Sequence, residues 1–202
     1  MKKIVSVFLF TMALVFISCN DDESQKNSDS VDSFAISIDS VQSIQMRKAI
    51  SLLMTRSGGL NNANITEEEA EDVIAPFVAR GRSIQRQILT FSAQPENYGQ
   101  VPSADLEVVE SLSDSQLAVV AIATDVWMGN IEPYSLDGSN LTVDQMVSCL
   151  SAAIGLSAIN ELAEDLSVRS AVIVIKAVAK KSGLGAISVA LLIYDFFDCI
   201  YG

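Results

Sequence analysis

The residue types that could do chemistry in this chain are three cysteines and a surplus of carboxylates, because histidine is absent. Without histidine the chain cannot build a Ser-His-Asp or Cys-His catalytic arrangement, or any zinc site with a histidine ligand. Three cysteines also fall short of a four-cysteine zinc site. Glu161 and Asp165 could share one helix face and act as acid and base, but a solvated pair is the simpler interpretation in so acidic a chain. We therefore expect a protein that is not an enzyme and that uses neither a metal nor a cofactor.

The first cysteine, Cys19, closely follows an apolar segment at the start of the chain. Two lysines precede a run from Ile4 to Ile17 that is apolar apart from one serine and one threonine, and a small residue, Ser18, comes next. This run is shorter than the roughly 20 apolar residues that a membrane-spanning helix needs. The pattern predicts a secretion signal over residues 1–18 that is cleaved just before Cys19.

The residues around Cys19 resemble a known bacterial export signal. Phe16-Ile17-Ser18-Cys19 resembles the lipobox of bacterial lipoproteins, in the looser form typical of the Bacteroidota. The acidic residues Asp21, Asp22 and Glu23 resemble the tag by which that group sends lipoproteins to the cell surface. The resemblance implies that Cys19 carries lipid, that this lipid anchors the protein in the outer membrane, and that the protein faces outward. An ordinary signal peptide or an N-terminal anchor helix is the alternative.

A polar stretch follows the lipobox. Residues 19–33 are rich in Ser, Asp and Asn and contain no aromatic side chain, so we expect a flexible tether. Ser30 and Ser40 each follow an aspartate and precede a valine, which resembles the O-glycosylation signal of exported Bacteroidota proteins. Matches of three residues are frequent by chance, so a Ser/Asp-rich linker is an equal alternative.

The balance of charge narrows the class of partner. Removal of residues 1–18 takes away two of the 13 basic side chains and none of the 25 acidic ones, which leaves a formal charge of −14. A chain of this charge is repelled by nucleic acid and by anionic membrane surfaces, so we expect neither as a partner. A solvated acidic surface is the simplest interpretation of the charge. A protein partner stays open, although the sequence does not identify one.

The rest of the sequence predicts an all-α fold. Three capping boxes, in which Ser or Thr is followed three residues later by Glu or Gln, start at Thr66, Ser113 and Thr142. Half of the residues are apolar, which is enough for a buried core. We therefore expect a small helical bundle over residues 34–202, with an internal boundary near residues 129–141 as an option. Its layout is similar to that of uncharacterised Bacteroidota lipoproteins, a likeness that implies no activity.

The segment that begins at Thr66 contains two helix-weakening residues and a basic cluster. Pro76 and Gly81 predict either a kink or two shorter helices. We interpret the basic cluster as pairing with the acidic side chains of the same segment, and it consists of Arg80, Arg82 and Arg86.

The end of the chain predicts an apolar helical hairpin with arms over residues 168–181 and 184–200. If the two arms lie antiparallel, Arg169 comes close to Asp195 or Asp198. A cation there would offset the unfavourable position of acids near a helix C-terminus. We therefore predict an ion pair between Arg169 and one of these two aspartates.

Cys149 and Cys199 are the two thiols that remain once Cys19 is acylated. An exported chain reaches an oxidising compartment, so these cysteines predict a disulfide that closes a loop of about 50 residues. The alternative is a pair of buried, reduced cysteines that act as small apolar side chains.

Together these patterns favour a non-catalytic, lipid-anchored protein of the cell surface or envelope, acting as an interaction or structural module for a ligand that the sequence does not name. Two alternatives remain open. The C-terminal hairpin could insert into membranes in the manner of small helical toxins, although its second arm ends in two aspartates. The acidic surface could also belong to an immunity or inhibitor protein that binds a basic toxin.

Overall fold

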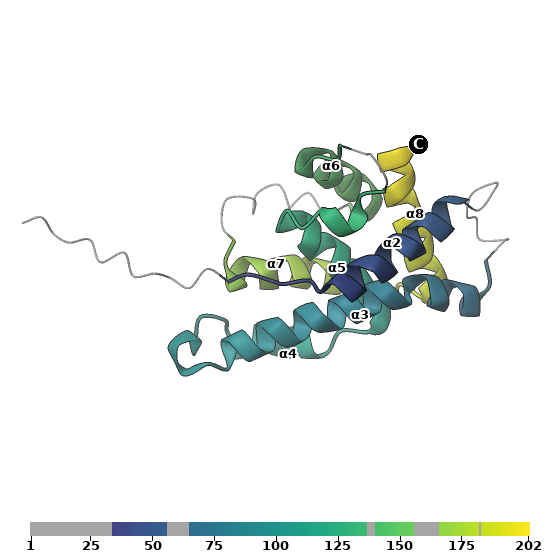
Figure 1. Cartoon of the computed structure of the whole chain (residues 1–202). Helices are drawn as coiled ribbons and strands as arrows, with labels where there is room; N and C mark the ends of the chain where they lie inside the picture. The colour runs from purple at the N-terminus through teal and green to yellow at the C-terminus, as the bar shows by residue number, and fades with distance from the viewer. Residues whose placement is uncertain (1–33, 56–64, 137–139, 156–165, 182) are drawn as a thin grey trace, which may run out of the picture. The chain divides into compact units, whose positions relative to one another are not determined.

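The computed structural model describes residues 34–55, 65–136, 140–155, 166–181 and 183–202. Within these ranges the chain forms seven α-helices, two short 3-10 helices and no strand, which confirms the all-α fold (Figure 1). The elements are α2 (Ser40–Thr55), α3 (Glu67–Ser92), η1 (Pro95–Asn97), α4 (Ser103–Glu110), α5 (Asp114–Trp127), η2 (Glu132–Tyr134), α6 (Val143–Ile154), α7 (Val168–Ala179) and α8 (Ala186–Tyr201). The predicted signal and tether, and the Glu161–Asp165 pair, lie outside the described residues.

All three predicted capping boxes are present, and each begins a helix. At α3 the hydroxyl of Thr66 accepts a hydrogen bond from the backbone N–H of Glu69, and the Glu69 carboxylate accepts one from the N–H of Thr66. Ser113 and Gln116 make the same exchange at α5, and the third box begins α6. Each box satisfies backbone N–H groups that have no partner within the helix. Local sequence therefore fixes where these three helices start.

The centre of the bundle is α5. Every side chain from Leu117 to Trp127 is buried, and the helix packs against α3, α6, α7 and α8 (Figure 1). Most of these side chains are alanine, valine or isoleucine, so the neighbouring helices can approach it closely on several sides. The core continues outward into large side chains of α3 and α8, which include Phe77, Phe196 and Phe197.

The two shorter helices predicted from Pro76 and Gly81 do not form, because α3 is one continuous helix of 26 residues. Proline has no N–H, so Pro76 removes the hydrogen bond that would reach the carbonyl of Asp72. The side chains that flank it are buried in the core, and their burial offsets this loss; they include Ile74, Phe77 and Val78.

Gly81 lies where α3 crosses α5. A Cβ atom added to it would lie 2.1 Å from the carbonyl oxygen of Leu117, which belongs to the backbone of α5. The absence of a side chain at Gly81 therefore allows the two backbones to come together at this point. What the sequence suggested as a weak point in a helix is a contact between helices.

The two predicted C-terminal arms form as α7 and α8, but they diverge in their packing. α7 packs mainly against α4 and α5, whereas α8 packs mainly against α3 and α6. The predicted ion pair of Arg169 with Asp195 or Asp198 is therefore wrong, and all three side chains are exposed. Lys176 of α7 instead pairs with Asp105 of α4, with Nζ 2.5 Å from Oδ1. None of the helices in the described ranges is long and apolar enough to cross a membrane.

The predicted disulfide between Cys149 and Cys199 is present, with the two Cα atoms 5.7 Å apart. It joins α6 to the last turns of α8, and α8 packs in turn against α3. The core is therefore continuous across residues 129–141, and one compact unit extends over Ser33–Gly202.

Replacing Gly81 by alanine should destabilise the protein. Alanine favours a helix interior by about 1 kcal/mol over glycine, but the clash with the α5 backbone forces a shift that typically costs about 1–3 kcal/mol or more. Since the contact is with main chain, we expect the clash to dominate and urea unfolding to show a net loss. Gly185→Ala is the control, because a Cβ there meets nothing within 4 Å. A Gly81→Ala protein as stable as the parent would contradict this close crossing.

Reducing the disulfide should lower the stability of the folded chain. For a loop of 50 residues, the chain-entropy model gives a loss of roughly 4 kcal/mol. The measurement compares urea unfolding of the mature chain carrying Cys19→Ser before and after reduction, so that no third thiol can exchange. In the denatured, unreduced protein an alkylating reagent should modify no cysteine, and modification of two would contradict the bridge.

Candidate functional site

The predicted lipid-attachment residue Cys19, the predicted export tag at residues 21–23 and the predicted glycosylation residue Ser30 lie outside the described residues. Cys149 and Cys199 are brought together as the disulfide, and Cys199 is exposed at the surface. No group of three or more Cys, Asp or Glu side chains in the described ranges could hold a metal ion. Two other features of the described residues, a buried polar cluster and an apolar groove, are built from different side chains.

Ser40, the second predicted glycosylation residue, is exposed at the first position of α2. The side chain of Asp39 before it accepts a hydrogen bond from the backbone N–H of Gln42 at 2.8 Å, as an N-cap aspartate does. Helix capping therefore accounts for the aspartate of this short pattern, and glycosylation of Ser40 stays a prediction.

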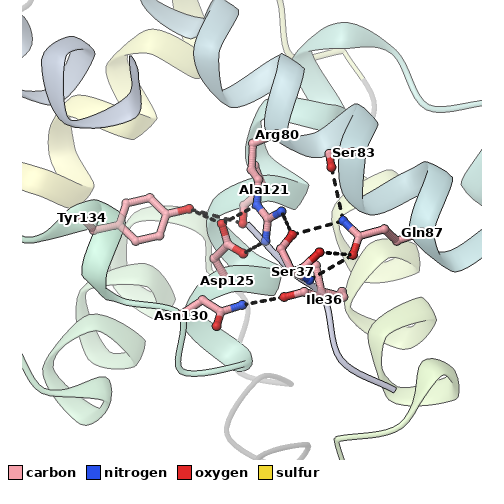
Figure 2. Close-up of polar contacts among 9 residues, drawn as sticks. All are labelled: Ile36, Ser37, Arg80, Ser83, Gln87, Ala121, Asp125, Asn130 and Tyr134. Carbon is pink, nitrogen blue, oxygen red and sulfur yellow. Dashed lines mark hydrogen bonds and ion pairs between the residues drawn. The ribbon is translucent and has the colours of Figure 1, made fainter. Parts of the chain in front are cut away.

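The buried polar cluster is centred on one arginine and one aspartate. Arg80 of α3 and Asp125 of α5 are both fully buried and form a two-pronged pair, with Nε 3.0 Å from Oδ2 and Nη2 2.5 Å from Oδ1 (Figure 2). Tyr134 of η2 is also fully buried, and its hydroxyl donates to Asp125 Oδ2 at 2.9 Å. The third nitrogen of the Arg80 guanidinium, Nη1, donates to the backbone carbonyl of Ser37 at 2.6 Å. The cluster thus joins three elements to the segment that precedes α2.

That segment, residues 34–39, is held by further hydrogen bonds. Gln87 of α3 accepts from the N–H of Ser37 at 2.9 Å and donates to the carbonyl of the same residue at 3.2 Å. The side-chain amide of Asn130 donates to the carbonyl of Ile36 at 3.2 Å (Figure 2). Phe34 packs its ring edge-on against Phe91, with ring centres 5.1 Å apart. The N-terminal end of the described fold is therefore fixed to α3.

The electrostatics of the cluster favour a structural role. Burial raises the pKa of Tyr134 well above its usual value, and the negative charge of Asp125 and the hydrogen bond to it add to this effect, while Arg80 opposes it. The hydroxyl therefore stays protonated and serves as a donor. Since both carboxylate oxygens of Asp125 accept hydrogen bonds inside a closed core, the cluster presents no group to a substrate.

The interpretation of the basic cluster as pairing within its own segment is wrong for two of its members. Arg80 pairs with Asp125, and Arg82 pairs with Asp114 at 2.7 Å, so both partners lie on α5. One signal for this was present in the sequence: Asp125 is the only charged residue between Leu117 and Trp127. A lone acid on a buried helix requires a cationic partner from elsewhere in the fold.

The second feature is a groove of about 480 Å³ between α2 and the N-terminal half of α3. Its apolar side chains are Ala49, Leu52, Val73 and Pro76. Its polar side chains include Lys48 from α2 and Glu69 and Asp72 from α3. A groove with an apolar floor and a few charged groups is the usual form of a binding surface.

The same side of α2 exposes further apolar area. Val41, Ile44 and Leu52 expose 61%, 64% and 57% of their surface, which is high for large apolar side chains. They are spaced so that, with Lys48, they follow one helix face at intervals of three or four residues. The buried face of α2 is a different one, which includes Met46, Ile50 and Leu53.

Comparison with protein-family models, with curated proteins and with solved structures finds no match to this chain.

Replacing Asp125 by asparagine should destabilise the fold far more than the same change at Asp114. Asp125→Asn leaves the Arg80 charge buried and uncompensated, which costs about 3–5 kcal/mol. The control pair Arg82–Asp114 joins the same two helices but is exposed, and such pairs contribute about 0–1 kcal/mol. Urea unfolding of both variants measures the difference. Equal losses would show that the buried pair is not a special constraint on the fold.

Proposed function

We propose that this protein is a non-catalytic binding module held by lipid on the outer surface of an outer membrane. The observation that carries the proposal is Cys19, which follows a short apolar signal and precedes three acids within four residues. Lipid on one cysteine anchors a chain stably when two or more acyl groups are attached. The polar residues 19–33 would then serve as the tether between the lipid and the helical unit.

Two features of the helical unit support a role in display and binding. Residues 34–39, where the tether would join the fold, are held to α3 by hydrogen bonds, so the chain meets the bundle at a fixed place. The groove between α2 and α3 then offers an exposed apolar surface. Exposed apolar surface on a soluble unit is commonly a contact site for another molecule.

The membrane-active alternative has less support. It requires the apolar side chains of α7 and α8 to leave the bundle, yet Val174, Ile175, Phe196 and Phe197 are buried in the core. It also requires α8 to move away from α6, to which Cys199 is joined by the disulfide. The immunity or inhibitor alternative is compatible with a binding module, because it differs only in specifying a basic toxin as the partner of the acidic surface.

Changing Cys19 to serine should abolish lipid attachment and leave an uncleaved precursor or a released protein. The measurement is metabolic labelling with an alkyne fatty acid, followed by fractionation of membranes. Cys149→Ser with Cys199→Ser is the control, because it removes the other two thiols and should keep the label. Labelling that persists without Cys19 would contradict the proposed anchor.

The acidic tag is tested separately in intact cells. Replacing Asp21, Asp22 and Glu23 by alanine should preserve the lipid label but protect the protein from external protease, because the protein then stays on the inner side of the membrane. Complete digestion of this variant on intact cells would contradict the proposed role of the three acids.

A further inference from the structure

We propose that the groove between α2 and α3 binds an amphipathic helix of a partner protein, and that this helix carries Lys or Arg side chains along the flank that faces α3. The proposal rests on the proposed function as a binding module, and it adds the site and the chemistry of the partner. Three observations carry it: the shape of the apolar surface, the distribution of charge on the two walls, and the effect of Pro76 on the wall formed by α3.

The apolar surface has the form of a long stripe. The face that contains Val41, Ile44 and Leu52 continues through Thr55 at the end of the groove. From Val41 to Thr55 a helix rises about 21 Å, which matches about four turns of a second helix laid alongside. An amphipathic helix that docks in a groove presents apolar side chains every three or four residues. On this face of α2, Val41 and Ile44 are separated from Leu52 by Lys48, so the matching face of the partner has two apolar ends with a polar or acidic position between them.

The two walls of the groove differ in charge. The first turns of α3 carry five acids between Glu67 and Asp72, and two of them, Glu69 and Asp72, line the groove. The wall formed by α2 contributes one cation to the lining, Lys48. A docked helix with basic side chains toward α3 and neutral or acidic ones toward Lys48 matches both walls.

Pro76 adds a further acceptor to the acidic wall. It lies in the groove one turn after Asp72, and because proline has no N–H, the carbonyl of Asp72 lacks its usual partner within the helix. That carbonyl and the exposed carboxylate of Asp72 together offer acceptors to a Lys or Arg side chain. An anionic lipid surface, by contrast, would be repelled by a chain whose mature charge is −14.

The probe is a synthetic amphipathic helix of Leu and Lys, about 18 residues long because shorter helices are marginal in water. It is titrated into the mature chain carrying Cys19→Ser, and binding is followed by calorimetry at physiological salt. Two control peptides have the same length: one replaces every Lys by Glu, and the other scrambles the sequence so that no apolar face remains. We expect the Leu/Lys helix to bind with a Kd on the order of micromolar and both controls to bind at least about 30-fold more weakly.

Matched variants separate the groove from the general acidity of the chain. Leu52→Lys and Asp72→Lys alter the groove, and each should weaken binding at least about tenfold. Leu166→Lys and Glu107→Lys make the same changes of charge at exposed positions outside the groove lining, and binding by these variants should stay within about twofold of the parent. Leu52 and Asp72 are exposed, so their replacement should leave the unfolding midpoint nearly unchanged.

Several outcomes would overturn the proposal. If the groove variants and their controls weakened peptide binding equally, the peptide would be responding only to the net charge of the chain. Equally tight binding of the scrambled peptide would lead to the same conclusion. Self-association of the chain that Leu52→Lys abolishes would make a second copy the occupant. Flotation with phosphatidylcholine vesicles that Leu52→Lys abolishes would assign the stripe to lipid.

This experiment is independent of the anchor, because the protein lacks Cys19. If the peptide binds but the native chain carries no lipid label, the proposed lipid-anchored function is refuted and the proposed peptide site in the groove stands. If the native chain carries the lipid label but the peptide does not bind, the proposed lipid anchor stands and the proposed helical partner is refuted.

Discussion

Moving an arginine and an aspartate out of water costs on the order of several kcal/mol per ion unless their charges and hydrogen-bonding groups are matched. Arg80 and Asp125 meet this condition with two direct bonds, a tyrosine hydroxyl and a backbone carbonyl. Because these partners come from α3, α5, η2 and the segment before α2, the pair can be satisfied only when all four lie in their native places. A packing that separated any of these partners would leave a buried charge or polar group unmatched, at a cost of about 3–5 kcal/mol for a broken buried pair.

The close crossing at Gly81 supports the same arrangement. It lies next to Arg80 on α3, and it allows the backbones of α3 and α5 to approach where the two helices meet. A larger side chain at this point would move α5 outward and with it Asp125. Steric fit and charge pairing therefore depend on each other, and the helical start positions set by the capping boxes bring both into register.

The sequence predicted those features that depend on a few neighbouring residues or on simple elimination. Capping boxes are local, so Thr66, Ser113 and Thr142 could each be identified from four residues, and Cys149 had one remaining partner. The Arg80–Asp125 pair was missed because its members lie 45 residues apart and local spacing favours acids on the same helix. The predicted Arg169 ion pair is wrong because the prediction assumed that two consecutive helices pack against each other. In the structure α7 packs mainly against α4 and α5, and α8 packs mainly against α3 and α6. The groove could not be predicted, because exposure of Val41 and Leu52 depends on tertiary packing.

The hydrogen bonds to Ile36 and Ser37 have a mechanical consequence. A force that pulls on the chain from its N-terminal side reaches residues 36 and 37 before it reaches α2. There it is resisted by Arg80, Gln87 and Asn130, of which Arg80 is paired with Asp125 in the centre of the bundle. The load therefore passes directly into the core, and α2, which forms one wall of the groove, is shielded from tension until these bonds break.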